Sequence, residues 1–136
     1  MNADLTPFDL ENTYVSFVGG GKAFSHLGGA AFWHALATGA GIPREISDAD
    51  ARMASLFHVD KDWSNWEVHP AGEELVYVLA GEIDMVFEFD GGSRTVRLKE
   101  RMGVLVPRGV WHTSNVVVPA QVLHITPGTG TRHRDR

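Results

Sequence analysis

Two short segments of this sequence carry side chains that bind metal ions or exchange protons. The first runs Glu67-Val-His69-Pro-Ala-Gly-Glu-Glu74, and the second ends at His112. Glu67 and His69 are two residues apart, so on a strand both would point to one face, roughly 7 Å apart. Two carboxylates and two imidazoles in one pocket are ligands for a divalent transition metal. We therefore predict a metal site made by Glu67, His69, Glu74 and His112.

Short apolar runs separated by turn residues must position these side chains. They are predicted as strands Trp66–His69, Glu74–Ala80, Glu82–Phe89, Ser93–Lys99, Val104–Val106, Trp111–Val118 and Gln121–Thr126. The separators include Asp90-Gly91, a signal for a tight hairpin, and the Pro107-Arg-Gly109 corner. This spacing is typical of an antiparallel sandwich or barrel, so the fold class is predicted as all-β.

Glu74 has an acidic neighbour, Glu73, and strand alternation distinguishes the two. Neighbouring residues on a strand face opposite sides, so only one of these carboxylates points inward. Glu74 follows the turn at Pro70-Ala-Gly72 and would lie on a strand next to His69. If Glu74 faces inward, Val76 and Val78 follow it and form an apolar wall under the ligands.

The first part of the chain is less regular. Thr13–Val18 and Ala54–Val59 are predicted as strands, and Ala30–Ala37 as a short helix or a strand. We expect a single domain over residues 1–136, with a core barrel at about 54–127. Residues 1–53 would be an N-terminal extension that adds strands and a short helix. Residues 128–136 would be a tail whose basic end, Thr131–Arg136, is solvated.

Composition restricts the partners and the compartment. The chain has 136 residues, of which 43% are apolar, which fits one globular domain. A net charge of −5 argues against nucleic acid as a partner. We see neither an apolar stretch of membrane-spanning length nor a signal segment, so we expect no membrane partner and a cytoplasmic location. The chain has no cysteine, so any metal must be bound through oxygen and nitrogen.

The two segments resemble the sequence motifs of the cupin superfamily. The first motif runs His-x-His, three or four residues, Glu, six residues, Gly, and it is matched here from Glu67 to Gly81 with Glu67 replacing the first His. The second motif ends Pro-x-Gly-x-x-His-x-x-x-Asn, and it is matched by Pro107, Gly109 and His112, while the Asn falls one place early at Asn115. The ending from Thr126 to His133 also resembles that of small bacterial single-domain cupins of unassigned role.

The resemblance implies a double-stranded β-helix (jelly-roll) barrel and a homodimer made through N-terminal strands. It also implies that His69, Glu74 and His112 bind a divalent metal, and Glu67 inherits the fourth ligand position. A set of two His and two carboxylates is harder than three His and one Glu, which disfavours copper. The expected cofactor is therefore Fe, Mn, Zn or Ni.

Three functions are compatible with these residues. The first is a metal-dependent dioxygenase, isomerase or lyase that acts on a small organic substrate, with Glu67 as fourth ligand or catalytic base. The second is a non-catalytic module that binds a small ligand and has a degenerate, metal-free site. The third is a mainly structural dimer in which the four polar residues satisfy one another.

Other side chains near the motifs have two interpretations each. His124 is either a buried, hydrogen-bonded histidine or a proton donor that reaches the pocket. Trp66 and Trp111 lie next to site residues, so alternation places them on the opposite face. There we expect them to pack between sheets or under the N-terminal segment.

Overall fold

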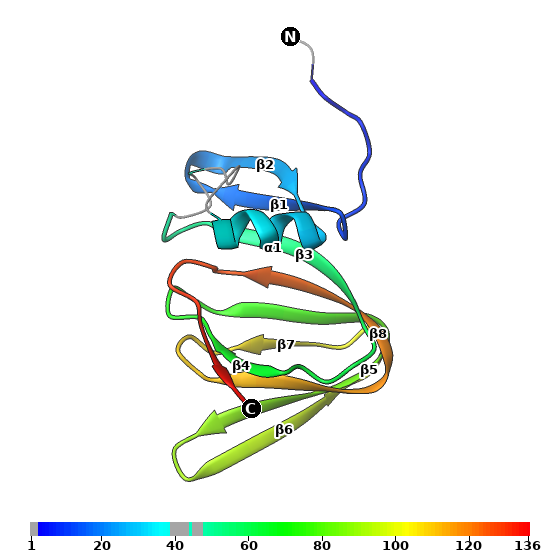
Figure 1. Cartoon of the computed structure of the whole chain (residues 1–136), viewed down its shortest axis with the longest axis vertical. Coiled ribbons are helices and arrows are strands. Elements are labelled where there is room, and N and C mark those ends of the chain that lie inside the picture. The colour runs from blue at the N-terminus through cyan, green and yellow to red at the C-terminus, as the bar shows by residue number, and fades with distance from the viewer. Residues whose placement is uncertain (1–2, 39–43, 45–47) are drawn as a thin grey trace.

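The computed structural model describes residues 3–38, 44 and 48–136 and is dominated by one curled sheet of nine strands (Figure 1). The strands are β1 (Thr13–Val18), β2 (Lys22–Leu27), β3 (Arg52–Val59), β4 (Asn65–Val68), β5 (Glu74–Phe89), β6 (Gly92–Leu98), β7 (Gly103–Val106), β8 (His112–Thr126) and β9 (Arg132–Asp135). A 3-10 turn at Gly19–Gly21 joins β1 to β2, and helix α1 (Gly29–Thr38) follows. Along the sheet the order is β2-β1-β3-β8-β4-β9, and β5 pairs with β6, β7 and β8. This is the all-β, jelly-roll type of fold that was predicted.

The two longest strands, β5 and β8, pair antiparallel from Leu75↔Ile125 to Phe87↔His112. The sequence predicted a break in each, at Gly81 and at Val118-Pro-Ala120, and those two breaks were wrong. The strands bend there and continue, with register shifts between Val78 and Ile83. Gly81 has φ +84, and a Cβ on it would lie 2.2 Å from the carbonyl oxygen of Pro119. Glycine is therefore required because the bent strands touch at this point.

The core lies on the concave side of β5 and its neighbours. Val76 and Val78 are fully buried, as the alternation predicted. Glu74 shares their face and is buried, whereas Glu73 is exposed. The buried apolar cluster comprises Val76, Val78, Ile83, Met85, Phe87, Leu98, Val106, Ala120 and Val122. The site is thus built on the wall of a packed core.

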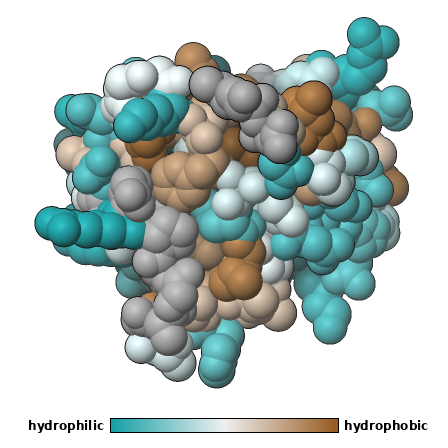
Figure 2. Space-filling model, turned by 90° about the horizontal axis from the view of Figure 1, so that it is seen from above, coloured by the Kyte–Doolittle hydropathy of each residue, from teal (hydrophilic) through white to brown (hydrophobic). Residues whose placement is uncertain are grey.

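The N-terminal part adds a hairpin and a helix above β3 (Figure 1). Strand β1 has the predicted bounds, β2 was not predicted, and α1 resolves the helix-or-strand alternative for Ala30–Ala37 in favour of helix. Tyr14 packs edge-to-face on Phe32 with ring centroids 5.3 Å apart, which attaches α1 to the hairpin. Apolar groups reach the surface at this end of the molecule, between hydrophilic ones (Figure 2). In the described part of the chain, every helix is too short or too polar to cross a membrane.

The prediction of a solvated tail missed a strand. Strand β9 pairs antiparallel with β4, from Asn65↔Asp135 to Val68↔Arg132. The Arg134 guanidinium lies 4.6 Å from the ring centre of Trp111 and 5.3 Å from that of Trp66. Trp66 and Trp111 therefore do face away from the site, but they pack under C-terminal arginines. Cation–π contacts explain why a basic tail becomes an ordered strand.

Candidate metal centre

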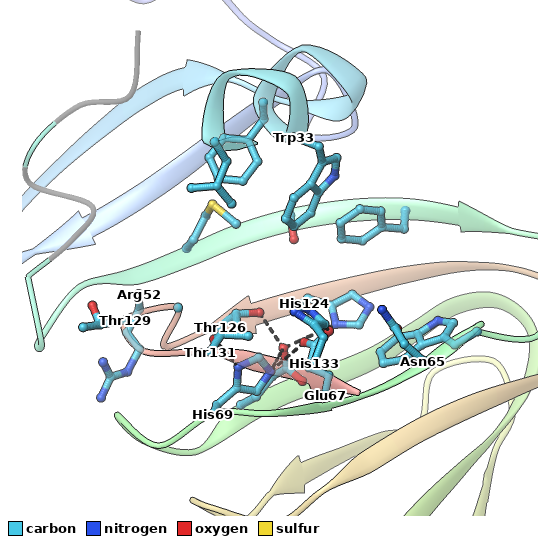
Figure 3. A pocket seen from close by; sticks show the side chains of 18 of the residues that line it. Trp33, Arg52, Asn65, Glu67, His69, His124, Thr126, Thr129, Thr131 and His133 are labelled. Carbon is cyan, nitrogen blue, oxygen red and sulfur yellow. Dashed lines mark hydrogen bonds and ion pairs between the residues drawn. The ribbon is translucent and has the colours of Figure 1, made fainter. Parts of the chain in front are cut away.

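The sheet brings the four predicted ligands to one point. Glu67 on β4 is the register partner of His112 at the start of β8, His69 follows β4, and Glu74 begins β5. One nitrogen or carboxylate oxygen from each residue forms a group in which all atoms lie within 4.8 Å of one another. Figure 3 shows Glu67 and His69 converging with His124 and His133 at the base of a cavity. The geometric expectation from the sequence, four groups meeting inside the barrel, is met.

Glu74 is the centre of the group. Its Oε2 lies 3.3 Å from His69 Nε2 and 3.6 Å from His124 Nδ1, and its Oε1 lies 3.4 Å from His112 Nε2. The Thr126 hydroxyl donates a hydrogen bond of 2.5 Å to Oε2. Burial alone raises the pKa of Glu74, but contacts with His112, His124 and His69 hold it well below its usual range. Glu74 is therefore a buried carboxylate that stays ionised.

His112 presents a lone pair to this carboxylate when its ring is neutral. Its Nδ1 donates to the carbonyl oxygen of Val110 at 3.0 Å, and a carbonyl can only accept. In the neutral ring Nε2 is then an acceptor that faces Glu74 Oε1, another acceptor. Among the described residues neither atom has a hydrogen-bond partner. Two buried acceptors that face each other are costly unless a proton or a cation lies between them.

Glu67, 21% exposed, is the most accessible member of the group, and it lies beside the buried His69. His69 Nε2 lies 2.8 Å from Glu67 Oε1, yet it has no partner of acceptable hydrogen-bond geometry in the described parts of the chain. Burial lowers the pKa of His69, but the carboxylates of Glu67 and Glu74 raise it to about 9. Burial raises the pKa of Glu67, and contact with His69 outweighs this and lowers it. Without a metal, a proton on His69 is the cation that this pair holds.

Four residues that contact the ligands were not predicted as site residues. Thr131 Oγ1 lies 2.8 Å from His69 Nδ1, and His133 Nε2 lies 3.3 Å from Glu67 Oε2. Thr126 contacts Glu74, as described above. His124 is buried, as one interpretation held, and it also reaches Glu74, as the other required. The spacing of Thr131 and His133, two apart like Glu67 and His69, was the available signal for the pair on β9.

A cavity of about 880 Å³ opens above the group. It reaches Glu67, His69 and Glu74, whereas His112 is fully buried beneath them. Trp33 of α1 lies across the cavity from the ligands (Figure 3). The apolar part of its lining includes Phe32, Trp33, Leu36, Met53, Phe57, Val59 and Trp63, and the polar part beyond the ligand group includes Ser16, Arg52, Asp62 and Asn65. The side chains described here thus leave room for a small organic molecule next to the polar group.

The donor set fits a divalent transition metal. Two carboxylates and two neutral imidazoles neutralise a 2+ charge, and nitrogen and oxygen donors suit Mn, Fe, Zn or Ni. Three of the ligand atoms are buried without hydrogen-bond partners in the described chain, namely His69 Nε2, Glu74 Oε1 and His112 Nε2. A cation at this point would satisfy all three.

The chain belongs to the cupin family. The family model described as Cupin domain matches residues 55–126, more than half of the chain. No curated protein matches the chain significantly.

Solved structures with a similar fold are distant in sequence. Bacillus subtilis oxalate decarboxylase, described with Mn(II) centres, is 20% identical with a TM-score of 0.50, over 62% of this chain and 23% of that one. Peruvianin-I, a cysteine peptidase from Thevetia peruviana latex, is 16% identical with a TM-score of 0.52, over 62% and 55%. A cupin-2 domain protein of Shewanella frigidimarina is 20% identical with a TM-score of 0.49, over 56% and 70%. At these identities the likeness to the oxalate decarboxylase and to Peruvianin-I shows the fold alone.

Proposed function

We propose that this cupin domain binds one divalent metal ion, Fe, Mn, Zn or Ni, through Glu67, His69, Glu74 and His112. The observation that carries the proposal is the group of ligand atoms within 4.8 Å, three of them buried and unpartnered within the described chain. The Mn(II) centres of Bacillus subtilis oxalate decarboxylase, which shares the fold, support it. A bound ion of this kind polarises a substrate oxygen or activates water or dioxygen.

We further propose that the protein is an enzyme of the oxygenase, isomerase or lyase type that acts on a small organic molecule. The cavity wall contributed by Phe57 and Trp63 would hold the apolar part of the substrate and exclude water. Glu67 lines the cavity and is the most exposed of the four, so it is placed either to remain a ligand or to accept a proton from a bound substrate.

A second candidate is a metal-free module that binds a small ligand in the same cavity. The 2.8 Å separation of Glu67 and His69 favours it, because a protonated His69 already neutralises part of the site. In that case the cavity is used without a metal, and His112 is a structural residue.

Metal analysis separates the two candidates. Protein purified without chelator is expected to contain about one equivalent of Mn, Fe, Zn or Ni, and a His112→Ala variant is expected to lose it. A His58→Ala variant, which removes an exposed strand histidine, is the matched control and keeps the metal. A metal-free wild type whose unfolding temperature is the same with and without added metal contradicts the proposal and favours the second candidate.

We also propose that the protein is a homodimer that pairs through its N-terminal hairpin. Strand β2 is at the end of the strand order, and Phe17 and Leu27 of the hairpin are 48% and 46% exposed. A free strand edge next to exposed apolar groups favours pairing with another chain. Light scattering coupled to gel filtration tests this, and a Phe17→Glu variant is expected to be a monomer.

A further inference from the structure

The C-terminal strand approaches the two ligands on and just after β4, Glu67 and His69, which we call the outer pair. Strand β9 runs beside β4, and its register places His133 opposite Glu67. Thr131 immediately precedes β9 and lies two residues before His133, so the two side chains point to the same face. Thr131 and His133 therefore reach toward the site, whereas Arg132 and Arg134 face the tryptophan side.

Each of the two inward side chains contacts one member of the outer pair. Thr131 Oγ1 is 2.8 Å from His69 Nδ1, which is the ring nitrogen away from the ligand group. His133 Nε2 is 3.3 Å from Glu67 Oε2, the oxygen away from His69. Both contacts thus involve the atom of the ligand that faces away from its neighbours in the group, because His69 Nε2 and Glu67 Oε1 are the atoms that lie 2.8 Å apart.

We infer that β9 positions the outer pair of the metal site, with Thr131 fixing the His69 ring and His133 holding the Glu67 carboxylate. This inference rests on the proposed metal site. A neutral His69 that binds metal through Nε2 carries its proton on Nδ1, and the Thr131 hydroxyl accepts that proton's hydrogen bond. Glu67 stands where the family motif has a histidine, and His133 contacts the carboxylate oxygen of Glu67 that faces away from His69.

The outer face of β9 explains how the strand is held firmly enough for this role. Arg132 and Arg134 lie 5.7 Å and 4.6 Å from the ring centre of Trp111. Arg134 also pairs with Glu88 of β5. Arg136 donates to the carbonyl oxygens of Trp63 and Ser114 at 3.0 Å and 3.4 Å. The outward side chains bind β9 to three other segments while the inward ones touch the ligands.

The test measures binding of Mn²⁺ alone by titration calorimetry. Thr131→Val removes the hydroxyl at nearly constant volume and is expected to weaken binding by about 10- to 100-fold, the usual effect of losing a partner that orients a ligand. Thr131→Ser restores the hydroxyl and most of the affinity. Thr95→Val makes the same change at an exposed position of β6 and leaves the affinity unchanged. His133→Ala, at a side chain 49% exposed, is expected to weaken binding without loss of folding.

A spectroscopic measurement tests whether Thr131 fixes the His69 ring. In the Zn²⁺-loaded protein, long-range proton–nitrogen NMR is expected to show His69 protonated at Nδ1 in the wild type and in Thr131→Ser. In Thr131→Val the Nδ1 proton has lost its hydrogen-bond acceptor, so it is expected to exchange with water faster than in the wild type. Equal Mn²⁺ affinity and an unchanged exchange rate of the His69 Nδ1 proton in Thr131→Val, together with wild-type affinity in His133→Ala, overturn the inference. A wild type that binds none of Mn²⁺, Fe²⁺, Zn²⁺ and Ni²⁺ instead overturns the proposed function.

Discussion

The two halves of the ligand group are built in different ways. The inner pair, Glu74 and His112, is 1% and 0% exposed and begins the two longest strands of the sheet. The outer pair, Glu67 and His69, lies on a four-residue strand and just beyond it, at the cavity. The inner pair is therefore fixed by the barrel itself, whereas the outer pair depends on contacts from β9. The long strands β5 and β8 thus carry the inner pair, and the short strands β4 and β9 surround the outer pair.

Removing the inner carboxylate is the largest perturbation that this comparison predicts. Glu74→Gln removes the charge that contacts His69, His112 and His124, so we expect it to abolish measurable Mn²⁺ binding. Titration calorimetry measures the effect. Glu73→Gln, the same change at the adjacent exposed carboxylate, keeps wild-type affinity. Comparable affinities in the two variants would contradict the central position assigned to Glu74.

A change of pH is expected to act through the outer pair. The pKa of His69 is raised to about 9 in the metal-free protein, so a proton competes with the metal below that value. We expect Mn²⁺ affinity to rise by up to about tenfold per pH unit between the ordinary histidine pKa of about 6.5 and 9. In chelator, where no metal is bound, the stability of the folded protein is expected to fall as the pH rises, whereas the Mn²⁺ affinity rises. The stabilisation from protonated His69 is complete below pH 6.5 and is lost as the pH rises through 9. A flat unfolding temperature in chelator over that interval would count against the His69 contacts.

Changing the outer carboxylate is expected to have a smaller effect than changing the inner one. Glu67→Gln keeps an oxygen donor at the cavity but removes its charge, so we expect Mn²⁺ affinity to fall by about 10- to 100-fold without abolition. Glu67→His supplies the imidazole of the usual family motif and is expected to bind metal. Affinities for Glu67→Gln and Glu74→Gln that fall by the same amount would remove the distinction between inner and outer pairs.

Loosening β9 from its outer side is expected to have the smallest effect. Arg134→Ala removes the guanidinium that lies over Trp111 and Trp66, but the backbone pairing of β9 with β4 remains. We expect a loss of about 1 kcal/mol in unfolding free energy and a fall in Mn²⁺ affinity of less than about tenfold. Denaturant unfolding measures the loss of unfolding free energy, and titration calorimetry measures the Mn²⁺ affinity. Arg94→Ala on the exposed part of β6 is the control. An Arg134→Ala variant as stable as that control would show that the stacking contributes nothing.

The sequence predicted the inner parts of the fold better than its edges. Alternation identified Glu74 over Glu73 and placed Val76 and Val78 in the core, because a buried strand face leaves a strict period of two. The prediction of a strand break failed at Gly81, where a residue typical of turns instead allows two bent strands to touch. Local preference cannot distinguish these cases, since the deciding contact with Pro119 comes from a distant segment.

The convergence of Glu67, His69, Glu74 and His112 was predicted because the motif spacing matches a known family, but the residues that contact them from β9 were not predicted. Thr131 and His133 lie in a basic segment that looked solvated, and their role depends on Trp66 and Trp111 stacking the intervening arginines. This stacking depends on contacts between segments that are distant in the sequence. The local sequence signals it only through the two-residue spacing of Thr131 and His133. The same applies to Thr126, whose hydroxyl meets Glu74 only because the curled sheet brings the end of β8 beside the start of β5.

The most direct test is an anomalous difference map from crystals grown with Mn²⁺. We predict one strong peak per chain, within about 2.4 Å of Nε2 of His69 and His112 and of a carboxylate oxygen of Glu74 and Glu67. A map with no peak among these four side chains, in protein shown to be folded, would contradict the account.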